Sequence, residues 1–399
     1  MPMVRAVAWP TSAVLGAAQE CAAAGGGGAN GTSSSATMTA MRAKRILLTV
    51  LSALAVSIAL VATAPPAAAH TVAGIGASNF ETVLDSVSPA VPGVRIEVIE
   101  LGSRLELRNT TGEEVVVLGY QDEPYLRIGP GGVFENVRSP ATYLNAARTG
   151  VRSLPPTADS SAPPSWRRAG TEPVARWHDH RTHWMADQPP PAVRHDPGRR
   201  HVIIDGWVVP LRAGSTEVEV KGRLLWVPGP SPAPWLVLAA LLFAVFVAAG
   251  LLLRGRVFRA VFAAGVATAV VSDVVHTFGT AAAVETASAT SASTAVVLAW
   301  LAAFASVVLF VVRGAERELE ALLAGAFAGA VIAVFGGLAD LSMLSRSQVP
   351  FDGPVALARA CVAVSTGVGF GLVAAGVLSR RRAVAAAASG TDEPVASPA

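Results

Sequence analysis

The hydrophobic pattern of the chain changes near residue 230. Before that point, apolar and polar residues alternate in short runs, for example in Val94-Arg95-Ile96-Glu97-Val98. After it, long apolar runs follow one another with few charges. Alternation with a period of two indicates half-buried β-strands, whereas an uninterrupted apolar run of about 20 residues indicates a transmembrane helix. The pattern therefore predicts a mainly-β domain followed by an all-α transmembrane domain.

The β domain is predicted over residues 70–227, and a length of roughly 160 residues is enough for a core of its own. Its strands are predicted at 94–100, 104–108, 115–120, 125–128, 201–211 and 216–227. Turn-forming residues at 109–112 and 129–132 separate two of these pairs. Several short strands with turn signals and no helical period favour a β-sandwich.

A long stretch between the early and late strands, residues 139–200, is rich in Pro, Ser and Arg and is predicted to be irregular. It leads into a His/Trp-rich loop at 176–201, which holds five of the seven histidines of the chain. In an extended segment His178 and His180 point to one face, and a turn would bring His183 to the same ion. Two or three imidazoles suit copper(II) or zinc(II) in a domain that lacks cysteine. The alternative is that these histidines hydrogen-bond locally and pair with neighbouring aspartates.

A secretory signal peptide is predicted at residues 41–69, from a basic start, an apolar middle and a small-residue cleavage site. Residues 1–40 show no element pattern and are predicted to be a disordered or mis-started leader. Cleavage after Ala69 would make His70 the amino terminus, where the α-amine and Nδ1 together chelate copper(II). The alternatives are an uncleaved membrane helix, or cleavage at a neighbouring residue that leaves His70 an ordinary polar residue.

A proline-rich linker, 228–234, leads into the transmembrane domain, 235–379. Five spans are predicted at 235–253, 257–283, 294–312, 321–341 and 354–378. The loops on one side of these spans contain Arg254, Arg256, Arg259, Arg313, Arg317, Arg380, Arg381 and Arg382. The loops on the other side contain only Arg346. Because arginine-rich loops stay on the cytoplasmic side of the membrane, this asymmetry predicts an extracytoplasmic β domain and a cytoplasmic tail, 380–399. The small and polar residues of this tail predict that it is disordered.

Ionisable residues inside the predicted spans are candidates for function, because a charge in lipid is costly. Asp273 and His276 are three residues apart and share one helix face, and Asp340 lies near the same predicted end of another span. They are candidates to receive an ion or to relay a proton. The alternative is that they pair with one another, and with Ser272 or Thr277, and only hold the helices together.

Composition excludes several classes of protein. With 52% hydrophobic and 15% charged residues, the chain is too apolar for an ordinary soluble protein. The basic pI of about 9.2 originates in the loops of the spans, since residues 70–233 hold 17 basic and 18 acidic residues, and no nucleic-acid partner is expected. The sequence carries no motif of serine hydrolases, zinc hydrolases or phosphate-binding loops, so an enzyme is not expected.

The layout resembles a known family. An Ala-Ala-Ala cleavage site directly before His70, a β-rich domain that closes with the strand 218–227, and a multi-span tail are together similar to the fused copper-resistance proteins of the CopC/CopD type. The resemblance implies copper binding outside the membrane, with His70 as a ligand. The chain equally resembles other exported multi-pass membrane proteins of actinobacteria.

Two functions follow from these observations. The first is an envelope membrane protein that captures copper, or another divalent metal, at His70 and the 178–183 segment and passes it to Asp273, His276 and Asp340. The second is a non-catalytic structural or partner-binding protein of the envelope, without a metal. Transport of a proton or solute is a third and weaker option, because the five spans show no repeat.

Overall fold

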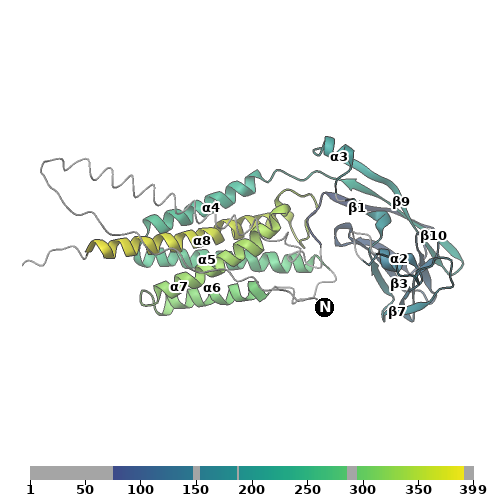
Figure 1. Cartoon of the computed structure of the whole chain (residues 1–399), viewed down its shortest axis with the longest axis horizontal. Helices are drawn as coiled ribbons and strands as arrows, with labels where there is room; N and C mark the ends of the chain where they lie inside the picture. The colour runs from purple at the N-terminus through teal and green to yellow at the C-terminus, as the bar shows by residue number, and fades with distance from the viewer. Residues whose placement is uncertain (1–74, 147–152, 187, 285–293, 391–399) are drawn as a thin grey trace, which may run out of the picture. The chain divides into compact units, whose positions relative to one another are not determined.

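The computed structural model describes residues 75–146, 153–186, 188–284 and 294–390. The predicted leader, the signal peptide and His70 lie outside the described residues. The described chain begins with antiparallel β-structure and continues into long apolar helices, as the hydrophobic pattern predicts (Figure 1).

The β region contains ten strands within the described residues. They are β1 (Phe80–Ser88), β2 (Val94–Ile99), β3 (Arg104–Asn109), β4 (Val115–Leu118), β5 (Pro124–Gly129), β6 (Gly132–Asn136), β7 (Trp166–Gly170), β8 (Val174–Trp177), β9 (His201–Ala213) and β10 (Thr216–Trp226). Short helices connect some of them: η2 (Glu100–Gly102), α2 (Pro140–Leu144), η3 (His180–Thr182) and α3 (Pro191–His195).

The strands form two antiparallel sheets. The larger sheet has seven strands in the order β1-β10-β9-β4-β5-β6-β7, and the smaller has three in the order β2-β3-β8. The hairpin of β9 and β10 pairs Ala213 with Thr216 across a tight turn, in which Gly214 has a φ of 56°. A seven-stranded sheet beside a three-stranded one is not a clear sandwich, so the structure supports the predicted antiparallel β domain without the finer description.

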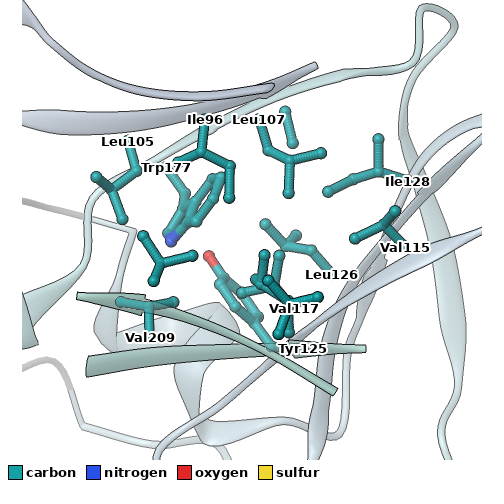
Figure 2. Close-up of a cluster of buried hydrophobic side chains, with 14 of the residues drawn as sticks. Ile96, Leu105, Leu107, Val115, Val117, Tyr125, Leu126, Ile128, Trp177 and Val209 are labelled. Atoms are coloured by element: carbon teal, nitrogen blue, oxygen red, sulfur yellow. The ribbon is translucent and has the colours of Figure 1, made fainter. Parts of the chain in front are cut away.

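Both sheets contribute to one hydrophobic core. Leu105 and Leu107 of β3 are 1% and 0% exposed, and Val115 and Val117 of β4 are equally buried. In Figure 2, Leu105 lies beside the ring of Trp177, and Val117 lies beside Tyr125 in the same cluster. The buried residues of β3 and β4 are two apart because successive side chains of a strand point to opposite faces. The alternation in the sequence therefore marks the side chains that form this core.

The stretch 139–200 is more ordered than its composition predicts. It contains α2, β7, β8, η3 and α3, so the prediction of an irregular segment is wrong for these parts. The sequence does not indicate strand β7, because its two arginines are adjacent and give no alternation of apolar and polar residues. The strand pairs with β6, and the guanidinium of Arg127 lies over the ring of Trp166, 4.9 Å from its centroid. Strand β1, also missed, lies at an edge and pairs with β10.

Five helices of the described chain are long and apolar enough to cross a membrane. They are α4 (Ala233–Leu252), α5 (Gly255–Ala282), α6 (Thr294–Val312), a fourth from Glu318 to Leu344, and α8 (Val355–Gly390). The fourth consists of α7 (Glu318–Ile332), the π-helical turn η4 (Ala333–Gly337) and the 3-10 helix η5 (Leu338–Leu344). All five predicted spans thus correspond to helices, and the bounds of the first four shift by at most three residues. Helix α8 continues beyond its predicted end at 378 to Gly390, so the prediction of a disordered tail is wrong for residues 380–390.

Helix α8, yellow in Figure 1, packs against α4, α5 and α7. The approach of α4 to α8 depends on glycine: a Cβ on Gly367 would lie 2.4 Å from the carbonyl oxygen of Ala239, and one on Gly250 would lie 2.7 Å from the Cα of Ala375. Small residues at such crossings let helix backbones come close together in lipid. At the end of α4, Arg382 donates hydrogen bonds to the carbonyls of Leu251 and Leu253 and so caps the helix.

Candidate functional site

The structure brings the three predicted intramembrane residues into one cluster. Asp273 and His276 lie on the same face of α5 and are 1% and 3% exposed. Asp340 reaches them from η5, and the Nε2 atom of His276 is hydrogen-bonded to Oδ2 of Asp340 at 2.8 Å. The spacing of three on α5 gives the shared face, whereas the chain turns that bring Asp340 close were not evident from the sequence.

An aromatic ring also contacts the face of the His276 imidazole. The ring of Phe351 stacks on it, with the ring centroids 6.5 Å apart and the planes 19° from parallel. The hydroxyl of Thr280, one turn along α5, donates to the backbone carbonyl of His276 at 2.9 Å. A ring fixed by a carboxylate at its edge and an aromatic ring on its face has little freedom to reorient.

Asp273 has a different partner. Its Oδ2 accepts a hydrogen bond of 2.7 Å from the indole nitrogen of Trp300 on α6. Trp300 was not singled out from the sequence, although a tryptophan inside a span needs an acceptor for its N–H. The neighbouring Ser272 donates to the carbonyl of Cys361 on α8 at 3.1 Å. Helix α5 is therefore tied to α6, α8 and η5 by polar contacts at one level.

Two atoms of this cluster have no hydrogen-bond partner within the described part of the chain. They are Oδ1 of Asp273 and Nδ1 of His276, and both are buried. Leaving a buried polar atom unpaired costs about 1–3 kcal/mol, and more for a charged group. Such groups in a native structure usually face a ligand, an ion, a proton or a water molecule. The cluster thus has unused capacity to bind.

A break in the fourth spanning helix borders the cluster. The π-helical turn η4 lies just before Asp340, and a Cβ added to Gly336 in this turn would lie 2.1 Å from Oδ1 of Asp273. π-Helical turns occur preferentially at functional sites, because the widened turn changes the direction of the side chains that follow. Here glycine allows the unpaired oxygen to approach the backbone of the turn closely, and the pair Gly336-Gly337 is the signal in the sequence that could have indicated it.

The three predicted metal-ligating histidines of the β region do not converge. Nδ1 of His178 lies 2.6 Å from the carbonyl oxygen of Ser103, and Arg104 donates to its Nε2 at 3.3 Å. His183 approaches the same carbonyl through Nε2 at 3.1 Å, and the rings of His178 and His183 are 6.4 Å apart. His180 lies elsewhere, with its ring 6.5 Å from that of Tyr120.

The loop that carries these histidines is anchored by an aspartate. Asp179 is fully buried and receives a two-pronged contact from Arg181, with both nitrogen–oxygen distances at 2.8 Å. The indole of Trp177 donates to the same carboxylate at 3.1 Å. The turn at η3 follows, because the Asp179 side chain also accepts from the backbone N–H of Arg181. This turn sends His178 and His180 to different partners, where an extended segment would have aligned them.

Within the described residues, the histidine loop does not by itself complete a metal centre. Over the described ranges, no group of three or more His, Cys, Asp or Glu side chains is arranged to hold a metal ion. Both ring nitrogens of His178 already have partners, so an ion would have to displace Ser103 or Arg104. Hydrogen bonds of His178 and His183 go to another part of the chain, whereas the carboxylate of Asp179 pairs within the loop. The two histidines are thus hydrogen-bonded, as the alternative predicted, but through contacts other than the neighbouring aspartates that it named.

Comparison with known proteins gives no family. No family model, no curated protein and no solved structure matches the chain. The resemblance to copper-resistance proteins therefore stays a prediction, and the functional argument rests on the geometry of the chain itself.

Proposed function

We propose that this chain is a multi-pass membrane protein with a proton-exchanging centre inside the membrane, formed by His276, Asp340 and Asp273. The observation that carries the proposal is a buried imidazole–carboxylate pair beside two buried polar atoms that lack partners. Imidazole is the side chain that most readily changes charge near neutral pH, and a carboxylate 2.8 Å away is positioned to share its proton.

The energetics of the membrane favour such an exchange. An ion pair of protonated His276 and ionised Asp340 has no net charge, and transfer of the proton along the hydrogen bond leaves two neutral groups. Either state avoids an isolated charge in a medium where one is expensive. A further proton on Asp273 would remove the remaining charge of the cluster. The His276–Asp340 pair is therefore neutral in either state, and uptake of one proton by Asp273 takes the cluster from a net charge of −1 to zero.

A purely structural role explains less of the geometry. Helix-to-helix adhesion accounts for the His276–Asp340 and Trp300–Asp273 hydrogen bonds. It gives no use for the unpaired Oδ1 of Asp273 or Nδ1 of His276. It also gives no reason for a π-helical turn at this level, where that oxygen lies against Gly336.

Orientation and export are part of the same proposal. The eight arginines of one set of loops, against Arg346 in the other, support a cytoplasmic position for the carboxyl end and an extracytoplasmic position for the β region. In this arrangement the β region is exported, and its surface is available to a partner in the envelope.

The proton exchange is tested by infrared spectroscopy of the full chain in lipid. Acidification from about pH 8 to pH 5 is expected to add the band of a protonated buried carboxyl group, and this band is expected to vanish in Asp273→Asn or Asp340→Asn. The control is Asp205→Asn, which changes an exposed carboxylate of β9 and should leave the band intact. An acid difference spectrum that is the same in the wild type and both intramembrane variants would refute the proposal.

Copper or zinc handling by the β region stays a prediction. The approach of the His178 and His183 rings is the one observation that favours it, and a third ligand would have to come from outside the described residues, where His70 lies. Titration of the full chain with each metal tests it. Binding that is lost in His178→Ala and His183→Ala, but kept in the exposed control His195→Ala, would support a metal at this loop. Equal binding by all variants would exclude the loop as the site, and no binding by the wild type would favour the metal-free envelope protein.

A further inference from the structure

A groove opens between α7 and α8, at the arginine-rich end of the helices. It encloses about 300 Å³. Its walls include Leu319, Leu323 and Ala326 of α7 and Gly376 and Val377 of α8. Three of these side chains are strongly exposed for apolar residues: Leu323 by 62% and Leu319 and Val377 by 41% each. Because the two helices are spanning segments, this surface faces the acyl chains of the membrane.

Small residues, and not close contact between helix backbones, form the floor of the groove. A Cβ on Gly376 would lie 3.8 Å from the Cβ of Ala326 and 3.9 Å from a ring carbon of Phe262, which are ordinary contact distances. Helix packing therefore does not require glycine here, in contrast to Gly250 and Gly367 on the α4 side. The two small residues line a channel that larger side chains would narrow.

Two arginines stand at the end of this channel. Arg380 and Arg381 complete its lining, and both are exposed. Two other cations at this end have partners away from the groove: Arg259 pairs with Glu318 at 3.0 Å, and Arg382 caps α4. Arg380 has no ion pair among the described residues. An apolar channel that ends at a cationic mouth is complementary to a molecule with a long apolar chain and an anionic head.

We propose that this groove binds an anionic phospholipid, with an acyl chain between α7 and α8 and its phosphate against Arg380 and Arg381. Guanidinium groups hold phosphate oxygens through paired N–H donors, and basic pockets between spanning helices are suited to acidic head groups. The apolar walls select a lipid over a free phosphate ester, which has nothing to place between Leu323 and Val377. This site is separate from the intramembrane centre and does not rest on its function.

The test is native mass spectrometry of the full chain, purified in a neutral detergent and offered equal amounts of phosphatidylglycerol and phosphatidylcholine with identical acyl chains. The wild type is expected to retain phosphatidylglycerol preferentially. The double variant R380Q/R381Q is expected to lower this preference about 30-fold, since each basic residue near an acidic head group contributes ~1 kcal/mol. The matched control is R256Q/R313Q, which removes two exposed arginines from the same end of the helices but none from the groove.

Further arms separate the lipid from its parts. Ala326→Phe fills the channel and is expected to lower retention with both arginines present, whereas R380K/R381K keeps the charge and retains most of the preference. Glycerol phosphate, the head without acyl chains, is expected not to compete. The proposal is overturned if R380Q/R381Q keeps the preference of the wild type, if both double variants lose it equally, if Ala326→Phe has no effect, or if glycerol phosphate competes. Unchanged circular dichroism of each variant confirms that it is folded.

Discussion

His276 and Asp340 are 64 residues apart in the sequence, yet the imidazole Nε2 of one and the carboxylate Oδ2 of the other are in hydrogen-bond contact at 2.8 Å inside the helical region. Only 4% of the His276 side chain and 15% of the Asp340 side chain are exposed. The pair joins α5 to the 3-10 segment that follows the π-helical turn.

A double-mutant cycle on this pair should reveal strong coupling. His276→Gln and Asp340→Asn each leave the other group without its partner, so each is expected to destabilise the protein by about 1–3 kcal/mol. The combined variant should lose less than the sum, because the second change removes a group that the first had already orphaned. Unfolding of the full chain in mixed dodecylsulfate micelles measures this, and additive losses would show that the pair does not interact.

Trp300→Phe should destabilise the same region. The change keeps an aromatic ring but removes the donor to Asp273, whose second oxygen already lacks a partner. A loss of about 1–3 kcal/mol is expected, with a smaller loss when Asp273→Asn is already present. Trp235→Phe at the start of α4 serves as the matched control in the same unfolding assay. Equal losses in the two tryptophan variants would argue against the hydrogen bond as the cause.

The substitution Gly336→Ala should destabilise the protein. A methyl group there would lie 2.1 Å from Oδ1 of Asp273, so the carboxylate or the π-helical turn must move, and overpacking of this kind costs about 1–3 kcal/mol. Gly376→Ala is the control, because its methyl group meets only contacts of 3.8 and 3.9 Å. Thermal unfolding of both variants in one detergent decides the matter. If Gly336→Ala is as stable as Gly376→Ala, the space beside Asp273 is not structurally constrained.

In the β region, Asp179→Asn is expected to be severely destabilising. It leaves the guanidinium of Arg181, 18% exposed, without the fully buried carboxylate that compensates its charge. Breaking a buried pair in this way is expected to cost about 3–5 kcal/mol. Asp85→Asn breaks a pair with Arg223 at the same distance of 2.8 Å but on the surface, and should change stability little. Similar losses from both changes in chemical unfolding would contradict the importance of burial.

The stability of the β region should fall in strong alkali. Burial raises the pKa of Tyr120 and of Tyr125 above the ordinary value of 10.0, with the charge of Asp179 contributing at both. The folded state therefore keeps neutral phenols while the unfolded state ionises. Their contribution is complete below about pH 10 and is lost as pH rises above it. Chemical unfolding at increasing pH should show a shallower decline in Tyr125→Phe; an identical decline would exclude this tyrosine as a cause.

Sequence periodicity predicts the spans and six of the ten described strands, but not which elements pack or pair with one another. The spans and six strands follow from apolar runs and alternation, since burial imposes those patterns directly. The shared face of Asp273 and His276 follows from helical geometry. Trp300 and the π-helical turn do not, because which helix packs beside α5 depends on tertiary contacts. Likewise β7 and β8 are short, and pairing with β6 and β3 stabilises them more than their own composition does.

The most direct test of the central claim is nitrogen-15 NMR of the full chain in lipid, with labelled histidine and the His276→Gln variant to assign the signal. A proton-exchanging centre predicts that the His276 ring resonances shift between about pH 8 and pH 5, and that Asp340→Asn alters this shift. Resonances of His276 that stay fixed in one protonation state over the whole range, in both the wild type and Asp340→Asn, would contradict the account.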